Sequence, residues 1–513
     1  MKIKHTVIGL LTGAFLMQAG EPVAKQAGVC FRFDDRKPVA HWNGMAELFD
    51  KYGYKLSLAI TSQDTTQPAE HAALKAIADR GHSIMDHLPN HAVYKIIARS
   101  QQEFDEYAKL PAVDHVNAAT RTVYFKYELN LADPGNRTFN AEIIGGKLRN
   151  FPAELAGELG YTRKIYHPQT GQVYGITFAG SERLLLSFWG EKVTVPDYKG
   201  ELVMLARNSA VQPSDALMRF LAETTRRNFS AMGLPAPKAW IQPGGWEECV
   251  APDRIERIYG KEFGYISADC RPGSNNRYAC AFNDSDPVSG RYTMLPDFTA
   301  PDNGQNIAAM KHNIADSIAK NRVKIFISHM SVNRVTGGWD AYLKDYDELL
   351  AWIKANSIPV KTQEEWTDIL YSQKPVANTN VMPTLTRDLD GDGKPDGYEL
   401  LNGAKADLTG GTVTIPAGGK LHISDVAGLE KGTNHFSLMV KGAAGTNVII
   451  DFFFVVRHGD NYIERKQFRI NSADWTKLEG TVTVKPEAMT LHYGVTFSNA
   501  TEAIEVKEPV FRQ

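Results

Sequence analysis

The stretch Phe-Arg-Phe-Asp34-Asp35, which starts at residue 31, ends a mostly apolar run with two adjacent carboxylates. A run of this kind predicts a buried strand that carries acids to the rim of a sheet. Further along, Gly81-His82-Ser-Ile-Met-Asp-His87-Leu-Pro-Asn-His91 contains a His-x3-His pair, which shares one face of a helical turn and can reach one ion. One carboxylate and two histidines suit Zn²⁺ or a similar divalent ion, and the second carboxylate is then free to take a proton.

The segments around these motifs predict alternating strands and helices. A helix is indicated by apolar residues at helical spacing, namely Trp42, Met45, Leu48, Phe49 and Tyr52. A β-rich run follows at 55–60, and a second helix at about 69–80 is closed by Gly81. Alone, an Asp-Asp pair is often a turn or a helix cap, and a His-x3-His pair is often structural. Together, at loop ends of a β–α–β–α order, they predict an α/β barrel.

The order of the motifs resembles that of the polysaccharide deacetylase family (NodB-homology, carbohydrate esterase family 4). Its first motif ends in Asp-Asp, as at Asp34-Asp35, and its second is His87-Leu-Pro-Asn-His91 behind Gly81-His82. Its third resembles the loop Trp240-Ile-Gln-Pro-Gly-Gly-Trp246, and its last resembles Ile327-Ser-His329. The resemblance covers residues 27–372, interrupted, and implies α/β architecture: a distorted (β/α) barrel.

The resemblance also implies a role for each matched position. Asp35, His87 and His91 would bind the metal, which could be zinc, cobalt, nickel or manganese. Asp34 would be the general base that deprotonates the attacking water. His329 would protonate the leaving amine or alcohol as general acid.

The third-motif loop departs from the family pattern. A backbone N–H at Gly245 would hold the oxyanion, with Trp246 at the substrate, although the two glycines also fit an ordinary tight turn. Gln242 stands where the family usually has an arginine that tunes the base, so we expect the pKa of Asp34 to rest more on the metal. Asp269 is the candidate acid that would orient His329, and a surface turn is its alternative.

Composition fits a secreted enzyme. The chain has 513 residues, of which 43% are hydrophobic, enough for a barrel core and further domains. Its net charge of -2 argues against nucleic acid and against an electrostatic membrane partner. Residues 1–20 read as a cleavable signal peptide, and their apolar run is too short to span a membrane. We therefore expect a secreted or periplasmic protein with no transmembrane segment in the mature chain.

The four cysteines would then meet an oxidising compartment. Cys270 and Cys280 bracket a Gly- and Asn-rich loop and make the most economical disulfide, although four cysteines allow three pairings. Cys30 lies on the first predicted strand, where a buried free thiol is plausible.

Composition and the positions of Pro, Gly and Asn residues predict three further segments. Residues about 95–210 carry several strand-like runs and predict a β-rich insertion that either walls a substrate cleft or pads the barrel. A helix over 215–232 returns to the barrel. Residues 373–404 read as a linker that contains a candidate calcium loop at 388–399.

The calcium loop has oxygen donors at the spacing of a Ca²⁺-binding loop, with Gly393 at its sixth position. The candidate structural ligands are Asp388, Asp390, Asp392, Lys394 (through its backbone), Asp396 and Glu399. A solvated acidic turn is the alternative.

Residues 405–513 alternate apolar and polar positions in many short runs, which predicts an all-β sandwich. Attached to a glycan hydrolase, it resembles a carbohydrate-binding module. Tyr462, Trp475 and Tyr493 would either stack on sugar rings or pack in the core.

The sequence thus predicts a secreted, metal-dependent deacetylase that removes N- or O-acetyl groups from an acetylated polysaccharide or oligosaccharide. One alternative is a glycan-binding protein that has lost catalysis, for which Gln242 is the supporting feature. A second is a metal-dependent hydrolase of a non-sugar amide.

Overall fold

The structure of this protein is a computed structural model, and only part of the chain is described in it. The described residues are 27–90, 95–111, 113–125, 127–129, 138–144, 147–149, 163–166, 173–178, 184–188, 191–193, 201–205, 211–241, 243, 255–270, 278–281, 294–297, 299–372, 382–424, 432–456, 462–486, 488–498 and 501–512. The predicted signal peptide, His91, Gln242, Gly245 and Trp246 lie outside them.

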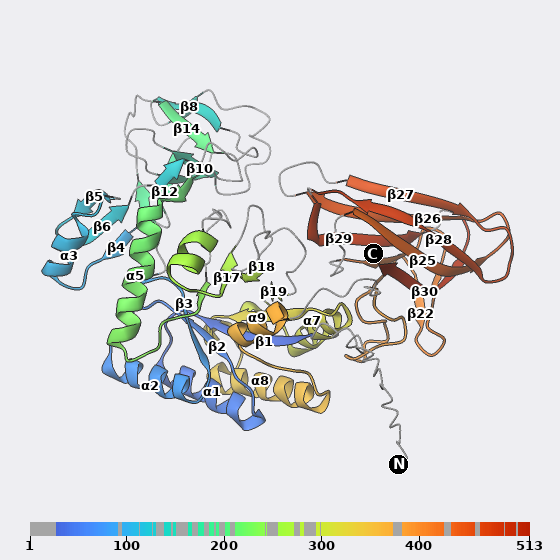
Figure 1. The fold of residues 1–513 in the computed structure, drawn as a ribbon, viewed down its shortest axis with the longest axis horizontal. Helices are drawn as coiled ribbons and strands as arrows, with labels where there is room; N and C mark the ends of the chain where they lie inside the picture. The colour runs from blue at the N-terminus through green and yellow to red at the C-terminus, as the bar shows by residue number, and fades with distance from the viewer. Residues whose placement is uncertain are drawn as a thin grey trace, which may run out of the picture.

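The sheet that carries the sequence motifs has eight strands in the order β18-β17-β16-β3-β2-β1-β20-β19 (Figure 1). Their bounds are β1 (Gly28–Asp34), β2 (Ser57–Ile60), β3 (Ser83–Asp86), β16 (Ala239–Ile241), β17 (Ser267–Cys270), β18 (Tyr278–Ala281), β19 (Met294–Asp297) and β20 (Val323–Ser328). All neighbours are parallel except β17 and β18. The described edge strands β18 and β19 do not pair, so the expected barrel is found as a curled half-barrel.

Helices cover this sheet, as a buried parallel sheet requires. They are α1 (Val39–Tyr52), α2 (Pro68–Asp79), α5 (Asp215–Ala231), α7 (Ile307–Ala319), α8 (Gly338–Ala355) and α9 (Gln363–Ser372). A π-helix (Glu256–Glu262) and two short 3-10 helices (Pro301–Asn303 and Val332–Arg334) complete the set. The helix predicted after the two aspartates is α1, which buries Trp42, Met45 and Phe49 against the sheet. The predicted β–α–β–α order is confirmed.

Between β3 and α5 the described chain is rich in β-structure. A three-stranded sheet consists of β4 (Lys95–Ile97), β5 (Val113–Asn117) and β6 (Thr122–Phe125), with α3 (Gln101–Tyr107) between β4 and β5. An antiparallel sheet has the order β13-β12-β11-β10-β14-β8-β9. Its strands are β8 (Thr138–Ile144), β9 (Lys147–Arg149), β10 (Arg163–Tyr166), β11 (Val173–Phe178), β12 (Leu184–Phe188), β13 (Glu191–Val193) and β14 (Glu201–Leu205). The short strands β7 (Tyr127–Leu129) and β15 (Val211–Pro213) pair with each other.

The C-terminal residues form two five-stranded antiparallel sheets, in the orders β21-β24-β29-β26-β27 and β22-β23-β30-β25-β28. Their strands are β21 (Glu399–Leu401), β22 (Lys405–Asp407), β23 (Thr412–Ile415), β24 (Lys420–Ile423), β25 (Gly432–Gly442), β26 (Asn447–Val456), β27 (Tyr462–Arg469), β28 (Thr476–Val484), β29 (Ala488–Ser498) and β30 (Ile504–Arg512). Residues of both sheets, such as Leu438 and Ile450, share one core. The expected all-β architecture is therefore present. Among the described residues, no helix is long and apolar enough to cross a membrane.

Cys30 is a buried free thiol, and burial raises its pKa to about 12, so it is chemically inert. On the antiparallel pair β17–β18, Cys270 faces Tyr278 and Cys280 faces Ala268. The two cysteines are therefore diagonal neighbours, about 7–8 Å apart. The side chains of Cys270 and Cys280 lie outside the described residues, so the expected bridge stays a prediction.

Candidate functional site

The two adjacent carboxylates stand at the carboxyl end of β1, inside the half-barrel sheet. Asp34 is the last residue of β1 and is buried. Asp35 follows with a φ of 74°, in the left-handed region, and its N–H donates to the carbonyl of Ala59 at 2.9 Å. The two carboxylates have different neighbours, since Asp34 faces Arg32 and Asp35 faces His87.

Asp35 faces His87, which follows β3. The distance from Asp35 Oδ1 to His87 Nε2 is 3.4 Å. The other ring nitrogen, His87 Nδ1, lies 3.1 Å from the carbonyl oxygen of Ile241, which can only accept a hydrogen bond. Nδ1–H therefore donates to this carbonyl, and Nε2 faces the carboxylate of Asp35. A proton on Nε2, or a metal ion between Nε2 and Oδ1, would make this contact favourable.

These two groups fit a metal ion. Two ligands that are each about 2.0–2.2 Å from a tetrahedral Zn²⁺ lie about 3.4 Å apart. The contact of His87 with Ile241 is of the kind that orients metal-bound histidines. Because His91 lies outside the described residues, its part in the ligand set stays a prediction.

Asp34 has a cation that we did not predict. Arg32 is fully buried on β1, and its Nε and Nη2 donate to the two oxygens of Asp34 at 2.8 and 3.0 Å. Burial raises the pKa of Asp34, but Arg32, with the charges of His87 and His329, outweighs burial and lowers it below the ordinary value. Our expectation that this pKa rests on the metal because of Gln242 overlooked Arg32. The signal was present in the sequence, since residues two apart on a strand share a face.

A second missed residue, Asp302, holds the loop that carries His329. Its Oδ2 accepts from the backbone N–H of His329 at 2.9 Å and of Ser331 at 3.1 Å, and from the hydroxyl of Ser328 at 3.0 Å. Asp269, our candidate partner of His329, is on β17, and because its side chain lies outside the described residues its role stays a prediction. The carboxylate found at the His329 backbone is thus Asp302. Only the turn-like sequence Pro301-Asp-Asn-Gly304 hinted at a loop there.

The two ends of β3 differ in their polar contacts. At the carboxyl end, Asp86 is fully buried and accepts from Tyr265 at 2.7 Å and from Thr225 at 3.0 Å, and burial raises its pKa to about 6. At the amino end, His82 Nδ1 accepts from the N–H of Leu56, and Nε2 lies 3.2 Å from Asp50. His82 is therefore a structural residue, remote from the paired carboxylates.

The calcium-loop candidates divide into two groups. Asp388, Asp390 and Asp396 each place one oxygen within 4.8 Å of the others. Asp392 instead accepts from Lys394 Nζ at 3.0 Å and, with Asp390, lies near His312 of α7. Glu399 is exposed on β21, pairs with His422, and belongs to neither group. The first three residues thus retain the arrangement expected of oxygen ligands.

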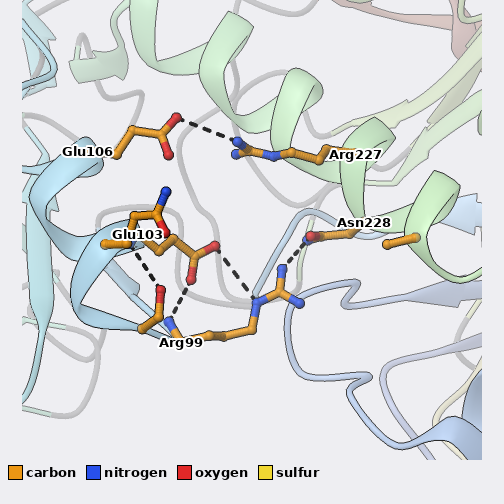
Figure 2. A pocket seen from close by; sticks show the side chains of 8 residues that line it. Arg99, Glu103, Glu106, Arg227 and Asn228 are labelled. Atoms are coloured by element: carbon orange, nitrogen blue, oxygen red, sulfur yellow. Dashed lines mark hydrogen bonds and ion pairs between the residues drawn. The ribbon is translucent and has the colours of Figure 1, made fainter.

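A polar groove lies between α3 and α5 (Figure 2). Its cavity of about 360 Å³ is lined by Arg99, Ser100, Gln102, Glu103, Glu106, Arg227, Asn228 and Ala231. Figure 2 shows Arg99 turned toward Glu103 and Arg227 toward Glu106, with ion-pair distances of 3.8 and 3.6 Å. The charges of this groove compensate one another, and it contains none of the predicted site residues.

On the sandwich, the aromatic candidates are mostly engaged by the protein. Tyr462 stacks on Phe454 with ring centroids 4.8 Å apart, and Lys507 lies over Trp475 at 4.5 Å. The side chain of Tyr493 lies outside the described part. Instead, Phe453 and Ile463, which are 37% and 58% exposed, face each other across β26 and β27.

Comparison with known proteins gives distant structural likenesses. No protein-family model and no curated protein matches the sequence. Among solved structures, the chain is similar to the Xyl-CE4 domain of a multidomain xylanase from the hindgut metagenome of Trinervitermes trinervoides. The identity is 7%, with 67% of this chain and 90% of that chain covered, and the TM-score is 0.28.

Further likenesses are to carbohydrate-binding domains. For the CBM22-1 xylan-binding domain from Paenibacillus barcinonensis, the identity is 17%, 26% of this chain and 95% of that chain are covered, and the TM-score is 0.21. For a family 16 carbohydrate-binding module, the identity is 14%, 23% of this chain and 86% of that chain are covered, and the TM-score is 0.18. TM-scores of this size assign neither a fold nor a family to this chain.

Proposed function

We propose that this protein is an exported, metal-dependent deacetylase that acts on an acetylated carbohydrate. The observation that carries the proposal is the 3.4 Å approach of Asp35 Oδ1 to His87 Nε2, beside a second carboxylate, Asp34, that has its own buried cation. A site built only to bind a metal would not need the second acid.

In this proposal each residue has one task. Asp35 and His87, with His91, hold Zn²⁺ or another divalent transition metal. When bound, the ion would supply Lewis-acid stabilisation of the acyl oxygen. Asp34 accepts the proton of the attacking water, and its lowered pKa keeps it ionised at neutral pH. His329 donates a proton to the leaving amine or alcohol, and Asp302 fixes the loop from which it does so.

The best test is acetate release from a panel of acetylated glycans with and without a chelator. The panel should contain chitin oligomers, acetylated xylan and peptidoglycan, because the N- or O-acetyl preference is open. Chelator-sensitive release that Zn²⁺ restores would support the proposal. No release from any substrate by metal-loaded protein would contradict it.

A second candidate function, glycan binding without turnover, is favoured by Phe453 and Ile463. An exposed aromatic ring beside an apolar neighbour on a sheet face offers a stacking surface for sugar rings. Phe453→Ala should weaken retention of the full chain on an insoluble glycan, whereas Tyr462→Phe should not. If both variants are retained like the wild type, this face is not the binding surface.

A further inference from the structure

The segment from Arg32 to Lys37 contains three cations, and each has a different partner. Arg32 pairs with Asp34 through both of its oxygens. Arg36 pairs with Glu70 of α2 at 2.7 Å. Lys37 Nζ lies 3.5 Å from Asp35 Oδ2, and its side chain is only 14% exposed. The two site carboxylates thus each have their own cation.

The two oxygens of Asp35 consequently have different surroundings. Oδ1 faces His87 Nε2, and Oδ2 faces Lys37 Nζ. A carboxylate that is held by one oxygen presents the other in a fixed direction. Lys37 itself is restrained, because it precedes Pro38, which confines its backbone to extended conformations, and α1 begins at Val39.

Without these cations, neighbouring carboxylates on one segment would repel each other, and either one could turn toward a bound ion. The buried fork of Arg32 holds Asp34 by both oxygens, which a single-point ammonium cannot do. The left-handed turn at Asp35 then directs the second carboxylate toward His87 and Lys37.

We propose that Arg32 and Lys37 are positioning residues that keep the two adjacent carboxylates in separate roles. Arg32 keeps Asp34 in the place of a base, and Lys37 restricts Asp35 to binding the ion through one oxygen. The proposal rests on the proposed function for the identity of the metal and of the base. It assigns separate consequences to the two cations, so the two arms can be tested independently.

The Lys37 arm is tested by metal binding, which needs no substrate. Apo protein is titrated with Zn²⁺ by calorimetry for the wild type, Lys37→Met, Lys37→Arg and the control Arg36→Met. Groups that orient a metal ligand typically contribute about 10- to 100-fold in affinity. We expect a loss of this size for Lys37→Met, recovery with Lys37→Arg, and no change for Arg36→Met. Tighter binding by Lys37→Met would overturn this arm, because it would show that the ammonium only competes with the ion.

The Arg32 arm is tested by turnover. Arg32→Lys keeps the charge but loses the fork, so kcat should fall at least tenfold while KM and the Zn²⁺ affinity stay near the wild-type values. A fall in Zn²⁺ affinity as large as the fall in kcat would contradict the proposal that the two carboxylates have separate roles. If Arg32→Lys does not fold, the Lys37 titration still decides the part of the proposal that concerns Lys37 and Asp35. If no substrate is turned over but Lys37→Met loses affinity, the proposed function fails and the positioning of Asp35 stands.

Discussion

Aspartates crowd together in two regions of this molecule, at the end of β1 and in the loop 388–396. At β1, Asp34 and Asp35 are neutralised by side-chain cations of their own segment. In the loop, Asp388 accepts mainly from backbone N–H groups, those of Gly391, Asp392 and Gly393. At β1 two side-chain cations direct the two acids to different neighbours. In the loop a backbone cradle holds Asp388, Arg387 lies 3.3 Å from Asp396, and the acids still converge on one point. We infer chemistry at the first region and a structural ion at the second.

The largest effect is expected at Asp34. Asp34→Asn keeps the shape but cannot accept a proton, so kcat should fall by about 10²- to 10⁴-fold, the usual contribution of a general base. Zn²⁺ content should be unchanged, because Asp34 is not among the proposed ligands, and metal analysis alongside acetate assays checks both expectations. Asp35→Asn is the matched control, which should lose metal. Metal loss in Asp34→Asn would mean that the roles of the two aspartates are reversed.

How far the sequence predicts each region depends on how local the contacts are. Helix α1 and the β–α–β–α order along the chain follow from the spacing of apolar residues. The spacing of acidic residues in the loop 388–399 places Asp388 and Asp390 together. Arg32 was missed although its contact is local, since we considered only the family arginine that Gln242 replaces and looked for no other cation beside Asp34. Asp302 was not predictable, because its contact with the His329 backbone exists only after β19 and β20 are side by side. The described residues of β18 and β19 contact each other without pairing, which is likewise a tertiary property.

Calcium should act on the loop and not on the half-barrel site. If Ca²⁺ binds Asp388, Asp390 and Asp396, a concentration 100-fold above its Kd stabilises the fold by about 2.7 kcal/mol. Thermal melts with and without Ca²⁺ measure this gain, and Asp388→Asn should reduce it. The same melts with Asp35→Asn should retain the gain. A wild-type melt that Ca²⁺ leaves unchanged would reduce the loop to a solvated acidic turn.

Two buried groups, His82 of the half-barrel and Asp396 of the loop, should affect the stability with opposite dependence on pH. Burial lowers the pKa of His82, with Asp50 opposing it, so its contribution to stability is complete above about pH 6.5 and is lost as the pH falls. Burial raises the pKa of Asp396 from 3.8 to about 6, so in the absence of Ca²⁺ its contribution is present below pH 3.8 and is lost as the pH rises to 6.

Urea unfolding at pH 5 and pH 8 separates the two signs. From pH 5 to pH 8, the free energy of unfolding should rise less for His82→Asn than for the wild type. For Asp396→Asn it should rise more than for the wild type. Added Ca²⁺ should bring the wild type closer to Asp396→Asn, since the bound ion offsets the cost of ionised Asp396. If the stability of all three proteins depends on pH in the same way, then the pKa values of His82 and Asp396 do not differ between the folded and the unfolded chain.

The smallest effect is expected where the loop meets the half-barrel. His312 Nδ1 of α7 lies 2.8 Å from Asp390 Oδ2, but the imidazole is 54% exposed, so the pair should contribute at most about 1 kcal/mol. His312→Gln should therefore shift the melting temperature only slightly in the absence of Ca²⁺. With Ca²⁺ the shift should disappear, because the ion takes over the oxygen that the imidazole contacts. A shift that instead grows with added Zn²⁺ would make His312, Asp390 and Asp392 a transition-metal site, and the loop and the end of β1 would then bind the same kind of ion.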